Sequence, residues 1–279
     1  MRIVPSSTSN FNYSGWGKSW ILGLIIASVL LGGLECLWRI NGHQPSIVDD
    51  QRLWAMERSK VGKSQKEIVL LGSSRMQTDI SMATLRGIFP DYSIVNLSAD
   101  GTCANAVIHD LAADEKFSGS VIMETTSECI MFGYDRILSQ QSYVDYYHKV
   151  YNLNARVNRL IATFFEKKLV MIDPYLNLIK VAGEFIRKKK LRKPNYLATY
   201  EDRTRSADYT KLDIENHRIN RVQHAEDHYR RLSPRISNDY FTQQAKYMDS
   251  AVKRIQNRGG RVVLVRFPVS DDHWTIDEQ

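Results

Sequence analysis

The chain has 279 residues, of which 43% are hydrophobic and 25% are charged, so it is not a disordered chain and holds one large domain or two small ones. The net charge of +7 favours anionic surroundings such as a membrane surface. We predict no nucleic-acid partner, because binding would need more aromatic residues interleaved with the basic ones and a known binding module.

The segment Trp20–Trp38 is predicted to cross a membrane as one helix. It has 19 residues with a single charge, Glu35, and as a helix it would span about 28 Å, close to the apolar thickness of a bilayer. Trp20 and Trp38 stand at its two ends, where interfacial aromatic residues belong. A cleaved signal peptide is the alternative, but Leu34-Glu35-Cys36 lacks the small residues of a cleavage site.

The charge bias around this segment favours an N-terminus on the inside. Residues 1–19 carry Arg2 and Lys18 and no acidic residue. The globular part is then expected outside the cytoplasmic membrane of a bacterium, in the periplasm or at the exterior, on a single-pass anchor. The sequence carries no signal for the oligomeric state.

After a connector over residues 39–66, the pattern predicts a parallel α/β sheet. The connector contains a short amphipathic helix, Gln51–Arg58. Continuous apolar runs, typical of strands buried on both faces, then alternate with segments of helical character. The predicted strands are Glu67–Leu71, Tyr92–Leu97 and Ser120–Glu124, and the helices between them are Met82–Ile88 and Cys103–Asp114.

The second half of the chain differs in composition. An insertion at about 135–240 is polar, rich in Tyr, Arg and Lys, and predicted to be mostly helical. A last helix, Tyr240–Arg258, ends at Gly259-Gly260 as helices commonly do. Arg261–Pro268 is the predicted fourth strand, and the α/β domain is assigned to residues 67–279.

Ser74 is the candidate nucleophile, because a buried strand that ends in Gly-Ser-Ser places a serine at the top of a sheet. Gly101, after the second strand, is the candidate oxyanion donor through its backbone N–H, together with the N–H of Ser74. The simpler interpretations are a strand-to-loop turn for the serines and a turn glycine with positive φ for Gly101.

Leu71–Arg75 followed by Asn96–Gly101 resembles the first two sequence blocks of the SGNH (GDSL-like) hydrolases, most of all their membrane-anchored bacterial branch. The stretch Glu35–Arg39, with Gly42 and Pro45-Ser46 after it, also resembles the juxtamembrane stretch of such proteins. The likeness covers roughly residues 20–130 and 240–275. It implies a three-layer α/β/α sandwich with a flavodoxin-like parallel sheet. It also implies cleavage or transfer of acyl esters, with Ser74 as the serine and Gly101 as the second-block glycine. Acylated polysaccharide or lipid at the cell surface is the implied substrate class, with no cofactor and no metal.

Two family features are missing. The family has an asparagine after the third strand, where this chain has the stretch Val121–Glu128 without an Asn, and a carboxylate there would oppose an oxyanion. The family's Asp-x-x-His follows a fifth strand, whereas the nearest candidates here, Asp271, Asp272 and His273, lack that spacing. We rank a C-terminally shortened hydrolase first, a degenerate relative second and a variant that uses His273 as base third. The alternative function is a degenerate module that binds glycan or a partner enzyme.

Two clusters of charged residues have a simple and a sharper interpretation. His217, His224 and His228 share one helical face, but a solvated charged helix is favoured over a metal site. Arg187–Lys193 has six basic residues in seven, which indicates a solvated helix end or contact with anionic lipid or polymer.

The three cysteines form no spaced framework. Cys103 and Cys129 each follow a predicted strand and could be neighbours, but unpaired thiols are favoured over a disulfide, and Cys36 lies in the predicted anchor.

Overall fold

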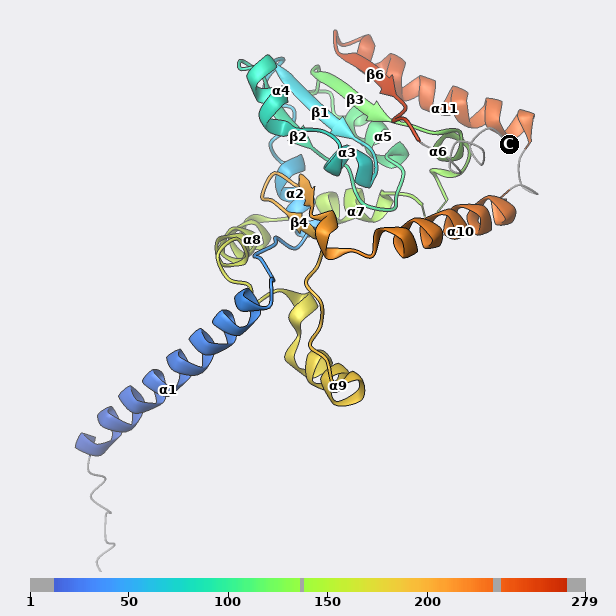
Figure 1. Cartoon of the computed structure of the whole chain (residues 1–279). Coiled ribbons are helices and arrows are strands. Elements are labelled where there is room, and N and C mark those ends of the chain that lie inside the picture. Colours follow the sequence, from blue (N-terminus) through green and yellow to red (C-terminus); the bar gives the residue numbers. More distant parts are fainter. Residues whose placement is uncertain (1–12, 136–137, 233–236, 270–279) are drawn as a thin grey trace, which may run out of the picture.

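The computed structural model describes residues 13–135, 138–232 and 237–269. A long N-terminal helix, α1 (Tyr13–Ile40), projects from an α/β domain built on a parallel sheet (Figure 1). The segment Trp16–Ile40 of α1 is long and apolar enough to cross a membrane, which agrees with the predicted anchor and extends it at both ends.

The sheet has four parallel strands in the order β2-β1-β3-β6. Their bounds are β1 Glu67–Leu71, β2 Ser93–Asn96, β3 Ser120–Glu124 and β6 Arg261–Val265. The chain leaves β1 for β2 on one side and returns to place β3 on the other side. A topological switch point therefore lies between β1 and β3, where open α/β sheets form their ligand crevices beyond the carboxyl ends of the strands.

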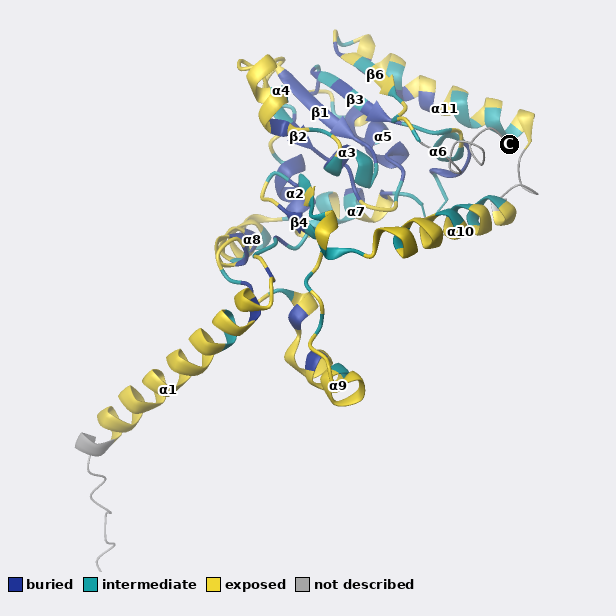
Figure 2. Ribbon diagram, in the orientation of Figure 1, coloured by how far each residue is buried: buried dark blue, intermediate teal, exposed yellow. Residues whose placement is uncertain are grey.

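Helices pack on both faces of the sheet, but unevenly. Val69 and Leu71 of β1 belong to the main core beneath α2, α5, α7 and α11, whereas Ile68 and Leu70 pack beneath the short α3 and α4. All five residues of β1 are buried, as a central strand covered on both faces should be. At the edge strand β6, by contrast, Val263 is 53% exposed (Figure 2).

The helices of the domain alternate with the strands up to β3 and then dominate the chain. Their bounds are α2 Gln51–Arg58, α3 Ser74–Thr78, α4 Met82–Ile88, α5 Asn105–Ala113, α6 Ser127–Phe132, α7 Gln141–Lys149, α8 Leu153–Glu166, α9 Leu178–Lys188, α10 Ile214–Leu232 and α11 Asn238–Gln256. The insertion also holds an antiparallel hairpin, β4 (Leu197–Thr199) and β5 (Arg205–Ala207), which the sequence pattern did not predict.

The C-terminal end of α1 packs on the domain and does not lie free at a membrane-water interface. Trp38, expected at the membrane surface, is 2% exposed and packs with Val170, Leu176 and Val181. The Glu35 carboxylate accepts hydrogen bonds from the backbone N–H of Val170 (3.0 Å) and of the next residue. Trp38 is therefore not exposed to lipid as an interfacial residue would be, because this ring belongs to a small protein core.

Candidate functional site

Ser74 lies at the first position of α3, directly beyond the carboxyl end of β1, as predicted. Gly72, which joins the two elements, has φ +156° and approaches β3 closely. A Cβ added there would lie 2.7 Å from both Cβ and Oε2 of Glu124 and 3.1 Å from Cβ of Met76. Glycine is therefore required, since it lets the turn that carries Ser74 lie against the end of β3.

Glu124 holds this turn in place. One oxygen of its carboxylate accepts the backbone N–H and the hydroxyl of Ser73, both at 2.8 Å, and the other accepts Nε of Arg75 at 2.9 Å. The Glu124 side chain is nearly buried, so its pairing with Arg75 balances a charge that water does not reach. The sequence argument that this carboxylate would oppose an oxyanion is weakened, since its charge is neutralised within the turn.

The loop that carries Gly101 is linked to the same turn. The N–H of Ala99 donates to the carbonyl of Gly72 at 3.0 Å. The buried Gln140 donates from Nε2 both to that carbonyl (2.9 Å) and to Oγ1 of Thr102 (3.0 Å). Gly101 itself is exposed, has φ +65° and would meet nothing within 4 Å if it carried a Cβ. Glycine at position 101 permits the positive φ of the loop, which is the simpler interpretation given for this residue above.

A disulfide joins Cys103, after β2, to Cys129 in α6, after β3. The expectation of unpaired thiols was therefore wrong. Each cysteine follows a parallel strand, and the carboxyl ends of parallel strands meet at one edge of the sheet. Together with Gln140, the disulfide fixes the loops after β2 and β3 relative to the turn after β1.

Among the described residues, no hydrogen bond joins the Ser74 hydroxyl to a histidine or to any other group. The ring of His109 bonds to Tyr134 and stacks on Tyr247, and burial lowers the pKa of His109, so the ring is neutral near pH 7. His148 pairs with Asp110. His273 lies outside the described residues, so the structure assigns no base to Ser74.

The histidines of α10 have different surroundings in the described part of the chain. His228 pairs with Glu128 of α6, and the ring of His217 contacts Tyr196. No group of three or more His, Cys, Asp or Glu side chains that could hold a metal ion occurs within the described part of the chain.

The β4–β5 hairpin, which sequence reasoning missed, lies against α3, the helix that begins with Ser74. Arg203, fully buried in the hairpin turn, donates from Nε to Asp49 (2.7 Å) and from Nη1 to the carbonyl of Asn96 (3.1 Å). Gln77 of α3 donates to the same aspartate at 2.7 Å. Nothing in the sequence indicates this network, because Asp49 and Arg203 are 154 residues apart.

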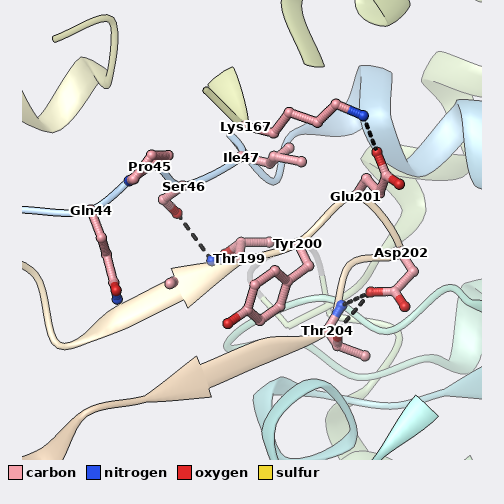
Figure 3. A pocket seen from close by; sticks show the side chains of 11 residues that line it. Gln44, Pro45, Ser46, Ile47, Lys167, Thr199, Tyr200, Glu201, Asp202 and Thr204 are labelled. Atoms are coloured by element: carbon pink, nitrogen blue, oxygen red, sulfur yellow. Dashed lines mark hydrogen bonds and ion pairs between the residues drawn. The ribbon is translucent and has the colours of Figure 1, made fainter. Parts of the chain in front are cut away.

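Two open grooves flank this hairpin. One, of about 540 Å³, lies between the chain after α1 and β4. Tyr200 is among the residues that line it, and Figure 3 shows Lys167 and Glu201 joined at one side by an ion pair of 3.1 Å. The second, of about 620 Å³, is lined by Thr78 and Asp79 at the end of α3. Neither groove is lined by Ser74 or Gly101, but Thr78 is one helical turn from Ser74, about 6 Å along the axis.

Comparison with protein-family models, with curated proteins and with solved structures gave no match. The SGNH resemblance therefore stays a prediction that rests on the quoted residues alone.

Proposed function

We propose that the chain is a membrane-anchored serine esterase or O-acyltransferase of the SGNH type, with Ser74 as nucleophile. The observation that carries the proposal is the place of Ser74 at the switch point between β1 and β3. Its hydroxyl there has no hydrogen bond to any described residue. The proposal includes the three-layer flavodoxin-like sandwich, which the strand order and the helices on both faces support.

In the proposed reaction, Oγ of Ser74 attacks an ester carbonyl and a base removes the hydroxyl proton. The N–H groups of Ser74 and Gly101 would hold the oxyanion. The Ser74 N–H is available for this because the first N–H groups of a helix have no partner inside the helix. Hydrolysis results when water attacks the acyl-enzyme, and transfer results when a hydroxyl of a surface polymer does so. The substrate would be an acylated polysaccharide or lipid.

The disulfide supports a location outside the cytoplasm. Disulfides persist in oxidising compartments and are rare in the cytosol, and Cys103 and Cys129 are paired. Combined with the apolar helix and the basic N-terminal tail, this favours a periplasmic or extracellular domain on a bacterial cytoplasmic membrane.

The test is reaction of the full-length chain in detergent with a fluorophosphonate probe, alongside hydrolysis of a p-nitrophenyl ester. We expect Ser74→Ala to abolish labelling and hydrolysis. Ser73→Ala is the matched control, because it keeps the backbone N–H bond to Glu124 and should retain labelling. Equal labelling of wild type and Ser74→Ala would refute the assignment.

A second candidate function is a non-catalytic module that binds cell-surface glycan or a partner enzyme. Its support is Glu124, which lies in the stretch where the family would have an asparagine and which accepts hydrogen bonds from the turn that carries Ser74. This candidate predicts that the folded wild-type chain stays unlabelled while it retains glycan or partner enzyme on a column.

A further inference from the structure

Helix α8 has the opposite polarity to a surface helix of a soluble protein. Its domain-facing side buries Arg159, which is 0% exposed and donates to Thr163 at 3.0 Å and to the carboxylate of Glu166. Its outer side carries apolar side chains, among which Phe164 and Phe165 are about half exposed. In water, a helix is stable when its apolar stripe faces the core and its charged face is solvated. The inverted arrangement indicates an apolar medium outside α8.

Helix α9 also presents an apolar face outward. Leu178, Ile179, Phe185 and Ile186 lie on one side at a spacing of i, i+1, i+7 and i+8, and Ile179 is 85% exposed. Val181, at the edge of this face, is buried against the domain. A short helix with one apolar face and a charged opposite face is typical of segments that lie in the plane of a membrane interface.

Both helices are fixed at the point where α1 leaves the membrane. Trp38 of α1 packs on Val181 of α9, and Arg39 donates to the carbonyl of Lys168, just after α8, at 2.7 Å. Figures 1 and 2 show α8 and α9 at the end of the domain nearest α1, with exposed residues on all three helices. The part of α1 before this docking, residues 16–33, spans about 27 Å, enough for the apolar layer of a bilayer.

A cationic segment adjoins the apolar face of α9. Arg187, Lys188, Lys189, Lys190 and Lys193 at its C-terminal end are all exposed. Basic residues close to a bilayer are attracted to anionic headgroups, each by about 1 kcal/mol. The positive charge of this surface therefore complements an anionic lipid layer. It would not complement a neutral protein partner.

We propose that the outer faces of α8 and α9 lie in the headgroup region of the membrane that α1 crosses. The exposed apolar side chains of both helices reach the acyl boundary, and the cations that follow α9 contact anionic phospholipid phosphates. Because this surface is continuous with the anchor, the domain keeps one orientation against the bilayer. It does not reorient freely about a flexible linker. This inference rests on the anchor within the proposed function but not on the chemistry of Ser74.

The test uses the full-length chain in vesicles of phosphatidylcholine and phosphatidylglycerol. In a Cys36→Ser background, an NBD fluorophore is attached to Ile186→Cys, to Phe164→Cys, to Ser28→Cys in α1 or to Lys246→Cys on α11. Lipids with spin-labelled acyl chains then quench any fluorophore in the bilayer. We expect strong loss of fluorescence at residues 28, 164 and 186 and none at residue 246.

Each other outcome overturns the inference in a distinguishable way. Quenching at residue 28 but not at 164 and 186 retains the anchor and refutes the interfacial surface. No quenching at residue 28 refutes the anchor and the surface together. Fluorophores at 164 and 186 that are shielded from aqueous iodide but not quenched by spin-labelled lipid would show that a second copy or another protein covers the surface.

The contribution of charge is tested with two matched double variants. Lys188→Glu with Lys190→Glu should reduce quenching at residue 186 in anionic vesicles and leave quenching at residue 28 unchanged. Lys63→Glu with Lys116→Glu, which changes the net charge equally at exposed positions remote in sequence from α8 and α9, should leave both unchanged. Equal loss in both double variants would refute a specific contact between the segment after α9 and lipid phosphates.

Discussion

Substitution of Gly72 by alanine should destabilise the domain. The added Cβ would lie 2.7 Å from two atoms of the Glu124 side chain, and one of them is Cβ, which cannot move without the β3 backbone. Overpacking of this kind costs about 1–3 kcal/mol, and a side chain at a backbone conformation that favours glycine costs about 1–3 kcal/mol more. We therefore expect a loss of about 2–6 kcal/mol in the free energy of unfolding, a large part of the typical 5–15 kcal/mol.

The assay is urea unfolding of the full-length chain in detergent, followed by tryptophan fluorescence, since Trp54 is fully buried in the main core. Gly87→Ala in α4 is the control, because a Cβ there meets nothing within 4 Å and should stabilise the helix by about 0.5–1 kcal/mol. In a Glu124→Gly background, which removes both contacting atoms, the cost of Gly72→Ala should fall by at least about 1 kcal/mol. The same cost in both backgrounds, or a cost below about 0.5 kcal/mol, would refute the close approach as its cause.

Three further outcomes follow from buried groups, each measured by the same unfolding assay. Asp49→Ala should lower the free energy of unfolding by about 3–5 kcal/mol, because it leaves the fully buried guanidinium of Arg203 without its carboxylate. A loss under about 1 kcal/mol would contradict this expectation. Replacing both Cys103 and Cys129 by alanine should lower the free energy of unfolding by about 3 kcal/mol, because the unfolded chain regains conformational freedom. If reduction of the wild-type disulfide leaves the stability unchanged, this expectation is contradicted. Burial lowers the pKa of His109, so the unfolded state binds more protons below about pH 6.5, and stability should fall as the pH drops from 7 towards 5. His109→Phe should flatten that dependence, and an unchanged slope would contradict it.

The sheet could be predicted from the sequence because its signals are local. Glu67–Leu71 and Ser120–Glu124 have the bounds that the apolar runs indicated, and the parallel pairing follows from the helices between them. The strand order then places Ser74 and the Gly101 loop at one edge of the sheet, as the spacing of the two sequence blocks suggested.

The hairpin beside α3 and the links between the loops could not be predicted, because their contacts join distant segments. The β4–β5 hairpin has strands of only three residues in a polar stretch. Strands this short cannot show the alternation of apolar and polar residues that predicts a strand. Gln140, whose amide links the loops of Ser74 and Gly101, lies in a region with no diagnostic pattern. Trp38 matched the pattern of an interfacial residue, and only its packing against a segment about 130 residues away shows that it is buried.

The two candidate functions differ in a single contact. A disulfide, the buried amide of Gln140 and the carboxylate of Glu124 fix the loops at the carboxyl edge of the sheet, and none of these contacts uses the Ser74 hydroxyl. An esterase needs such rigidity, because a nucleophile displaced by 1 Å loses much of its rate, and a binding module needs it to keep its surface preorganised. Stability measurements on these loops therefore cannot separate the functions. Only a proton acceptor at Ser74 distinguishes them, so reaction with the fluorophosphonate probe is the decisive readout.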